Sequence, residues 1–313
     1  MKLATANKDG EDFFGLLTEQ GLLEVRSAWP EGPESVLEAL QAGPAALARM
    51  KTLRPSDGKV HPLSAVRLRA PILRPPKLIG LAVNYAEHHK EFNRGHSLPE
   101  NPKLRTTPRP FLMPGTCVLD PGADIPWPSY SRQIDYEIEL AAVIGRTCKD
   151  VSAQEARECI AGYTIANDVS ARSVSYAEGR EKRPQDGFFD WLHGKWADGF
   201  CPLGPWIVTS DEIPDARDLR LELWVDEEKR QDESTRAMIF DVYELVSFCS
   251  RLMRLEPGDV IATGTPSGVG MPQGKLLQGG SRVRCRIQGI GELVNTMGRP
   301  PKDFFDPFGA GKT

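Results

Sequence analysis

The sequence predicts an α+β protein that is mostly β, in which a small N-terminal α+β domain precedes a larger one. Short β-rich segments greatly outnumber helices beyond residue 75, which leaves too few crossover helices for a doubly wound parallel sheet. Only residues 152–161 and 242–252 are persuasive helices in that part. A proline-rich passage at residues 70–76 separates the two parts of the chain.

The small N-terminal domain is expected to cover residues 1–70. Apolar runs at residues 12–17 and 22–26 indicate two short strands, and a helix is expected over residues 35–53. Ser35 can cap this helix, whereas Pro44 is expected to break or kink it.

The larger domain is expected to cover residues 75–298, and a tail rich in proline and glycine follows at residues 299–313. Its second helix opens with Asp241 and Glu244, a spacing typical of a helix cap, and continues with apolar residues near helical spacing. The expected strands are the segments 77–83, 111–113, 135–144, 163–166, 205–209, 219–225, 259–263 and 282–287.

Composition excludes several classes of protein. The 39 basic residues stand against 43 acidic ones, and the net charge of -4 with no basic tract argues against nucleic acid as a partner. No stretch approaches the ~18 apolar residues of a membrane span, and the N-terminus lacks the apolar core of a signal peptide. We therefore expect a cytoplasmic protein with no membrane partner. The six cysteines are scattered, so buried free thiols are favoured over disulfides.

Two glutamates, Glu137 and Glu139, interrupt the apolar run 135–145. Side chains two apart on a strand point to the same face, so the two carboxylates share one patch. A third acid, Asp168, ends a second apolar strand at residues 163–168. Three oxygen ligands with no histidine or cysteine beside them suit Mg²⁺, Mn²⁺ or Ca²⁺ rather than zinc. The alternative interpretation is a solvated face of an antiparallel sheet.

A histidine and a glutamate follow an expected strand on a short helix. His88 and Glu91 are three residues apart and share a helical face, whereas His89 is turned away from it by about 100°. A carboxylate beside an imidazole orients the ring and stabilises its protonated form, so His88 is a candidate general base. The alternative is an incidental pair on a solvated helix.

Two basic residues are candidates for contacts with a negatively charged ligand. Lys195 lies between Gly194 and Trp196 and could stabilise an enolate, or could be a surface lysine. Arg172 could hold a substrate carboxylate through a two-pronged hydrogen bond, or could be a structural ion-pair partner of Asp168 or Glu139.

A glycine-rich turn follows the expected strand at 259–263. Gly264 and the glycines at 268 and 270 let the backbone approach a ligand, and Thr265 offers a hydroxyl and an amide. The segment lacks the G-x-x-x-x-G-K-[ST] pattern of a phosphate loop. A plain turn is the alternative.

Five motifs in this order resemble the fumarylacetoacetate hydrolase family, whose members cleave or rearrange 2-oxo and 2,4-dioxo acids at a divalent metal. The likeness runs from about Pro75 to about Val294, and it implies a mixed β-roll or sandwich for the larger domain. The motifs are Asn84 to Phe92, Glu137-Ile-Glu139, Asp168-Val-Ser-Ala-Arg172, His193-Gly-Lys195-Trp196 and Thr263 to Gly270.

The resemblance implies a role for each candidate residue. It implies Mg²⁺, with Mn²⁺ or Ca²⁺ as alternatives, bound by Glu137, Glu139 and Asp168. It implies that the helix of His88 is a mobile lid, and that the catalytic residues are His88, Glu91 and Lys195. It implies substrate contacts from Tyr85, Arg172, Gly264 and Thr265.

The expected function is metal-dependent hydrolysis of a carbon-carbon bond in a 2,4-dioxo acid of the acylpyruvate or fumarylpyruvate type, giving a 2-oxo acid and a carboxylic acid. One alternative is a decarboxylase, isomerase or hydratase of 2-oxo dicarboxylates in aromatic catabolism, which passes through the same enolate. Another is a non-catalytic protein in which the metal ties strands together.

Two departures from the family pattern bear on the substrate. Many relatives carry a lysine where this chain has Met113, and a glutamine where it has Ser175. Both positions lie in regions that shape the substrate pocket in the family, so the identity of the acid does not follow from the resemblance. The apolar strands predict a homodimer, and the resemblance implies one too, since members of the family commonly form dimers.

Overall fold

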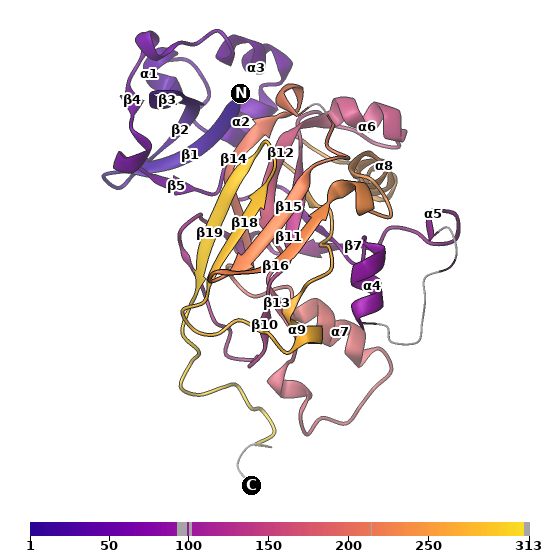
Figure 1. Ribbon diagram of the computed structural model, residues 1–313. Coiled ribbons are helices and arrows are strands. Elements are labelled where there is room, and N and C mark those ends of the chain that lie inside the picture. The colour runs from indigo at the N-terminus through magenta and orange to yellow at the C-terminus, as the bar shows by residue number, and fades with distance from the viewer. Residues whose placement is uncertain (93–98, 100–101, 214, 310–313) are drawn as a thin grey trace.

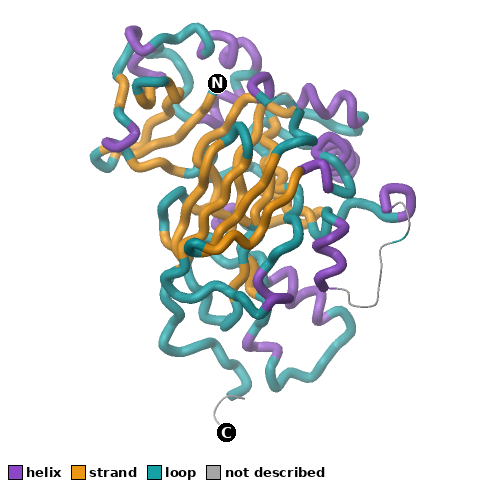
Figure 2. Tube along the Cα trace, viewed as in Figure 1, coloured by secondary structure: helices purple, strands orange, loops and turns teal. Residues whose placement is uncertain are grey.

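The computed structural model describes residues 1–92, 99, 102–213 and 215–309. Two β-sheets form the body of this part of the chain, and short helices lie around them (Figure 1). Strands form the centre of the trace, and helices and loops lie around them, as Figure 2 shows by colour. The expected α+β, mostly β fold is therefore confirmed. No helix in the described ranges is long and apolar enough to cross a membrane.

The larger sheet has 12 strands of mixed direction. Its order is β4-β3-β2-β1-β14-β12-β11-β17-β6-β7, with β5 paired to β1 and β8 paired to β14. Its strands are β1 (Lys2–Lys8), β2 (Glu11–Thr18), β3 (Gly21–Glu24), β4 (Val60–His61), β5 (Arg67–Arg69), β6 (Leu78–Leu81), β7 (Pro110–Met113), β8 (Val118–Leu119), β11 (Ile138–Ile144), β12 (Ile160–Asn167), β14 (Cys201–Thr209) and β17 (Val260–Ala262).

The N-terminal segment adds strands to this same sheet. Leu3 of β1 pairs with Ile207 of β14, so the first 70 residues and the larger domain are joined by backbone hydrogen bonds. The expected helix at 35–53 is two helices, α2 (Val36–Gln41) and α3 (Pro44–Met50). The break expected at Pro44 is confirmed, and Pro44 begins the second helix, since proline is tolerated in a first helical turn.

A second sheet packs against the first. Its order is β16-β15-β18-β19-β9, and Figure 1 shows it in front of β11, β12 and β14. Apolar side chains of both sheets, including Leu140, Ile165, Leu221 and Leu293, share one buried core. The strands are β9 (Asp124–Ile125), β15 (Arg220–Val225), β16 (Glu228–Ser234), β18 (Arg282–Ile287) and β19 (Gly291–Met297); β10 (Ile134–Asp135) and β13 (Ser170–Ala171) form a separate pair.

Both expected helices of the larger domain are present, as α6 (Ala153–Cys159) and α8 (Val242–Leu252). Asp241 caps α8 by accepting hydrogen bonds from the backbone nitrogens of Tyr243 and Glu244. The further α-helices are α1 (Val25–Ala28), α4 (Ala86–Phe92), α5 (Pro102–Arg105), α7 (Asp186–His193) and α9 (Gly270–Gln273). All six cysteines are buried free thiols, as expected.

Candidate metal centre and active site

The site forms where several strand ends meet. In the antiparallel pair of β11 and β12, Glu139 lies opposite Ala166, so the start of β11 meets the end of β12. The backbone nitrogen of Asp168 then donates to the carbonyl of Glu137 at 2.9 Å. Strand β17 also runs antiparallel to β11, so the turn after β17 reaches the same edge of the sheet. Antiparallel pairing thus brings Asp168 to Glu137 and Glu139, which precede it by 31 and 29 residues in the chain.

Three carboxylates form a compact cluster at this edge. One oxygen from each of Glu137, Glu139 and Asp168 lies within 4.8 Å of the others. All three residues are buried, so the alternative of a solvated sheet face is wrong. Oε1 of Glu139 and Oδ1 of Asp168 are buried without a hydrogen-bond partner in the described part of the chain. Buried acceptors without donors are costly, and a divalent cation is the partner that fits this all-oxygen set.

Burial and neighbouring charges move the three pKa values apart. Burial raises the pKa of Glu139 well above its ordinary value, and the charges of Asp168 and Glu137 add to the effect. Burial also raises the pKa of Asp168 to about 6, although Lys195 opposes it. For Glu137, Lys195 and Arg172 outweigh burial and lower the pKa to about 2. The neighbouring cations therefore compensate the charge of Glu137 fully, but they compensate the charges of Glu139 and Asp168 only in part.

Lys195 lies inside this cluster. Its Nζ donates to Oε2 of Glu137 at 2.9 Å and to Oδ2 of Asp168 at 2.6 Å. The side chain is only 3% exposed, so the alternative of a surface lysine is wrong. Burial opposes its charge, but the two carboxylates outweigh burial and raise its pKa, so it is an ammonium ion. Gly194, the residue before Lys195, packs closely against the backbone of Ala171. A Cβ at this position would lie 2.4 Å from the carbonyl oxygen of Ala171, so a larger residue would clash.

Arg172 bridges two acids at the rim of the cluster. Its Nε donates to Oδ2 of Asp135 at 2.8 Å, and its Nη2 donates to Oε1 of Glu137 at 2.5 Å. The structural alternative named the wrong partners, since these contacts go to Asp135 and Glu137 rather than to Asp168 or Glu139. The arrangement holds one oxygen of Glu137 in place while Lys195 holds the other.

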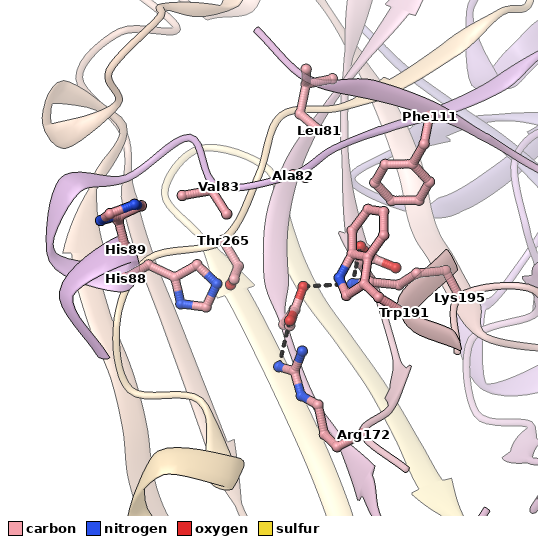
Figure 3. A pocket seen from close by; sticks show the side chains of 12 residues that line it. Leu81, Ala82, Val83, His88, His89, Phe111, Arg172, Trp191, Lys195 and Thr265 are labelled. Carbon is pink, nitrogen blue, oxygen red and sulfur yellow. Dashed lines mark hydrogen bonds and ion pairs between the residues drawn. The ribbon is translucent and has the colours of Figure 1, made fainter. Parts of the chain in front are cut away.

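The pair on α4 forms as the spacing indicated. Nδ1 of His88 lies 3.1 Å from Oε2 of Glu91, and His88 is buried, so the pair is not solvated. Oε1 of Glu91 accepts from the backbone nitrogen of Gly268 at 2.8 Å. Glu91 therefore orients the imidazole and also joins α4 to the glycine-rich turn. His89 also belongs to the cavity lining, although its ring points away from that of His88 (Figure 3).

A cavity of about 220 Å³ opens over the cluster (Figure 3). The lining residues are Leu81, Ala82, Val83, His88, His89, Phe111, Glu137, Asp168, Arg172, Trp191, Lys195 and Thr265. Six of the expected site residues are among them, namely His88, Glu137, Asp168, Arg172, Lys195 and Thr265. Four others, Tyr85, Glu91, Glu139 and Gly264, are not.

These four residues lie behind the lining. Glu91 contacts His88, as described above. Glu139 is itself a member of the carboxylate cluster. The backbone nitrogen of Gly264 donates to its Oε2 at 2.7 Å and so fixes this carboxylate. Tyr85 is buried, and burial together with the charge of Glu139 raises the pKa of its hydroxyl well above the ordinary value. The hydroxyl oxygen of Tyr85 is buried without a hydrogen-bond partner in the described part of the chain.

Two supporting residues escaped the sequence analysis. Asp135 is fully buried and, besides Arg172, accepts hydrogen bonds from the backbone nitrogens of Gly270 and Met271. It thereby ties the glycine-rich turn to the carboxylate cluster. Its place beside the glutamates in the run 135–145 was the only signal in the sequence.

Gln231 of β16 is the second supporting residue that the sequence analysis missed. Its Nε2 donates to Oγ1 of Thr265 at 2.9 Å and to the carbonyl of Pro266 at 2.8 Å, and its Oε1 accepts from the backbone nitrogen of Ile138 at 3.1 Å. One amide therefore joins the turn to the residue between the two glutamates. The strand around it is so polar that its sequence gave no strand signal.

The two departures from the family pattern lie outside the cavity lining. Met113 is buried in the apolar core beside Leu78 and Cys117. Ser175 donates a hydrogen bond to the carbonyl oxygen of Phe305 near the C-terminus.

Comparison with known proteins identifies the family. The model of the fumarylacetoacetate (FAA) hydrolase C-terminal domain matches residues 77–298, well over half of the chain. The chain belongs to the fumarylacetoacetate hydrolase family. It is 35% identical over 279 residues to the mitochondrial oxaloacetate tautomerase FAHD2A of Bos taurus, covering 88% of this chain and 84% of that protein.

Solved structures of the fumarylacetoacetate hydrolase family share the fold. Maleylpyruvate hydrolase from Sphingobium sp. SYK-6, in complex with manganese (II) ion and pyruvate, is 27% identical with a TM-score of 0.76, covering 96% of this chain and all of that one. A 5-carboxymethyl-2-hydroxymuconate delta-isomerase from Mycobacterium smegmatis is 35% identical with a TM-score of 0.71, at the same coverage. The named relatives are thus enzymes of three kinds: a tautomerase, a hydrolase and an isomerase.

Proposed function

We propose that the protein is a divalent-metal-dependent hydrolase that cleaves a carbon-carbon bond in 2,4-dioxo acids. The products are a 2-oxo acid such as pyruvate and a carboxylic acid. One observation carries this proposal: the carboxylate cluster, the ammonium of Lys195 and the pair of His88 and Glu91 all face or support one cavity. The related maleylpyruvate hydrolase, crystallised with manganese and pyruvate, supports it.

The metal site would consist of Glu137, Glu139 and Asp168. These carboxylates suit Mg²⁺, with Mn²⁺ or Ca²⁺ as alternatives, and the two buried oxygens without donors on Glu139 and Asp168 support the assignment. A bound divalent ion would supply Lewis-acid polarisation of the substrate oxygens. Lys195 and Arg172 hold Glu137 from two sides, which keeps this ligand ionised and fixes its orientation.

His88 would act as the general base. Glu91 contacts Nδ1, so Nε2 is the nitrogen that accepts a proton from water. The water oxygen bonds to C4 of the substrate, the C3–C4 bond breaks, and its electron pair stays on C3 as an enolate. The ammonium of Lys195 stabilises that negative charge, and the proton taken from water is returned to C3. Atoms balance as one dioxo acid plus one water giving one 2-oxo acid and one carboxylic acid.

Substrate contacts are proposed for Arg172 and Thr265, which line the cavity. Tyr85 and Gly264 would act from behind the lining, Gly264 by fixing Glu139 through its backbone nitrogen.

A second candidate is tautomerisation, isomerisation or decarboxylation of a 2-oxo dicarboxylate. The 35% identity to the bovine oxaloacetate tautomerase favours it. These reactions also pass through an enolate, so they would use Lys195, but they need no activated water. The difference between the candidates therefore rests on His88.

Product analysis tests the proposal. The metal-loaded protein is incubated separately with an acylpyruvate, with oxaloacetate and with an unsaturated 2-oxo dicarboxylate, and proton NMR follows the products. We expect pyruvate and the matching carboxylate from the acylpyruvate, and none after treatment with a chelator. An acylpyruvate that undergoes only keto-enol exchange, while oxaloacetate or the unsaturated acid is converted, would favour the second candidate.

A further inference from the structure

The cavity has one charged side and one apolar side. Leu81, Ala82 and Val83 follow one another along the wall away from the carboxylates, as Figure 3 shows. Phe111 and Trp191 add two aromatic rings to the lining near Lys195, with ring centroids 5.1 Å apart in an edge-to-face contact. A substrate whose 2-oxo acid end lies at the carboxylate cluster therefore has its distal end against aliphatic and aromatic surface.

The permanent cations of the lining are already paired. Lys195 contacts Glu137 and Asp168, and Arg172 contacts Asp135 and Glu137. No other lysine or arginine belongs to the lining, as far as the structure describes the chain. Positive charge for a second substrate carboxylate would have to be taken from these ion pairs.

The charges of the cluster balance once a divalent ion is bound. Four buried carboxylates face two buried cations: Asp135, Glu137, Glu139 and Asp168 against Lys195 and Arg172. One divalent ion brings this sum to zero. A monocarboxylic 2-oxo acid adds one negative charge at the metal, where it has a partner. A dicarboxylic acid adds a second charge against the apolar wall, where the described lining offers no lysine or arginine beyond Lys195 and Arg172 and where burial of a charge is costly.

We infer that the enzyme selects 2,4-dioxo monocarboxylic acids with an apolar acyl tail and discriminates against dicarboxylic acids. The inference rests on the proposed function for the reaction itself. It separates this chain from relatives whose names refer to dicarboxylic substrates, among them the oxaloacetate tautomerase and the maleylpyruvate hydrolase.

A matched pair of substrates tests the inference. Butyrylpyruvate and succinylpyruvate have the same carbon chain and differ only in a terminal methyl or carboxylate group. Cleavage of each is measured with the metal-loaded wild type at pH 8, where lysine and arginine stay charged. We expect kcat/KM for butyrylpyruvate to be higher by about 10² or more, since an unpaired buried polar group reduces transition-state binding by that order.

Binding is measured separately from turnover. Calorimetry compares 2-oxopentanoate with 2-oxoglutarate, two acids that again differ in a terminal methyl or carboxylate. The expected result is tighter binding of 2-oxopentanoate by about tenfold or more. If both acids bind but neither dioxo acid is cleaved, the proposed hydrolysis fails while the binding preference can still be read.

A variant with an added positive charge in the apolar wall tests the same inference. Val83 is half-buried in the wall and has a φ of 56°, which an unbranched side chain tolerates better than valine. Val83→Lys adds a cation to the wall, and Val83→Met is the neutral control of similar length. We expect Val83→Lys to raise kcat/KM for succinylpyruvate at least about tenfold relative to Val83→Met.

Three results would overturn the inference. These are equal or faster cleavage of succinylpyruvate by the wild type, equal or tighter binding of 2-oxoglutarate, and no gain for the dicarboxylate in a folded Val83→Lys variant. Thermal melting establishes that the variant is folded. If it is not, the two wild-type comparisons decide the question by themselves.

Discussion

At the scale of single residues, Glu139 is the ligand whose contacts depend most on a cation. One of its oxygens accepts from Gly264 and the other is buried without a donor, whereas Glu137 is held by both Lys195 and Arg172. Burial and two neighbouring carboxylates raise its pKa. A metal ion bound to Glu139 would therefore pair its buried oxygen and offset the repulsion from the two neighbouring carboxylates.

Glu139→Gln tests this account. The substitution keeps the shape of the side chain and removes its charge, so we expect Mg²⁺ or Mn²⁺ affinity to fall by about 10² or more. Without metal, the variant is expected to melt at the same temperature as the wild type or higher, because a like-charge repulsion is removed. Isothermal calorimetry and thermal melting measure both effects.

The matched control is Glu292→Gln, an exposed glutamate of β19 that lies outside the cavity lining. It is expected to leave metal affinity unchanged. Equal metal affinity in Glu139→Gln and the wild type would contradict the assignment of this ligand.

The metal ligands could be predicted from the sequence because their chemistry stands out locally. Glu139 within β11 and Glu137 directly before it interrupt an apolar run, and burial of two carboxylates is costly unless a cation or a base accompanies them. Asp135 and Gln231 lack such a conflict in the sequence, since their partners are backbone groups and side chains from distant strands. Only the tertiary structure brings those partners together.

At the scale of elements, the spacing of apolar residues decided which helices and strands could be predicted. The bounds of α8 and β18 match the expected segments, because apolar residues recur there at the period of a helix or a strand. Strand β16 lies at the edge of the five-stranded sheet and has mainly polar side chains. Its pairing with β15, rather than its own sequence, makes it a strand.

Gln231 gives this edge strand a function that can be tested. In Gln231→Glu, a carboxylate replaces the amide that donates to Thr265 and Pro266. We expect a loss of about 1–3 kcal/mol in the free energy of unfolding, because a buried carbonyl loses its donor and faces a second acceptor. A lower kcat is expected as well, since the turn that carries Thr265 is no longer fixed.

Urea unfolding and steady-state kinetics measure the two effects. Gln278→Glu serves as the control, since Gln278 is exposed and lies outside the cavity lining. An unfolding free energy for Gln231→Glu within about 0.5 kcal/mol of the wild type would show that the amide contributes no fixed contact.

At the scale of the whole molecule, the first 70 residues extend the large sheet that also carries the metal ligands. The pairing of β1 with β14 creates this continuity. Sequence patterns locate a proline-rich boundary at residues 70–76, but they do not report which strands pair across it, because strand pairing is set by distant partners. The division into domains at this boundary remains a prediction.

A homodimer is the expected state of the protein. Several large apolar side chains near the cavity are exposed, with 56% exposure for Phe188, 46% for Phe189 and 39% for Trp196. Apolar surface of this kind is typical of a face that a partner covers. Sedimentation equilibrium at micromolar concentration is expected to give twice the chain mass of 34.6 kDa. The mass of a single chain at that concentration would refute the dimer.

The central claim is that His88 activates water while Lys195 stabilises an enolate. His88→Ala and Lys195→Met are compared with the wild type for cleavage of butyrylpyruvate and for keto-enol conversion of oxaloacetate, with metal affinity measured in parallel. We expect His88→Ala to lower kcat for cleavage by about 10² to 10⁴ and to spare both the keto-enol conversion and metal affinity. Lys195→Met is expected to impair both reactions. Cleavage by His88→Ala at the rate of the wild type would contradict the hydrolytic mechanism.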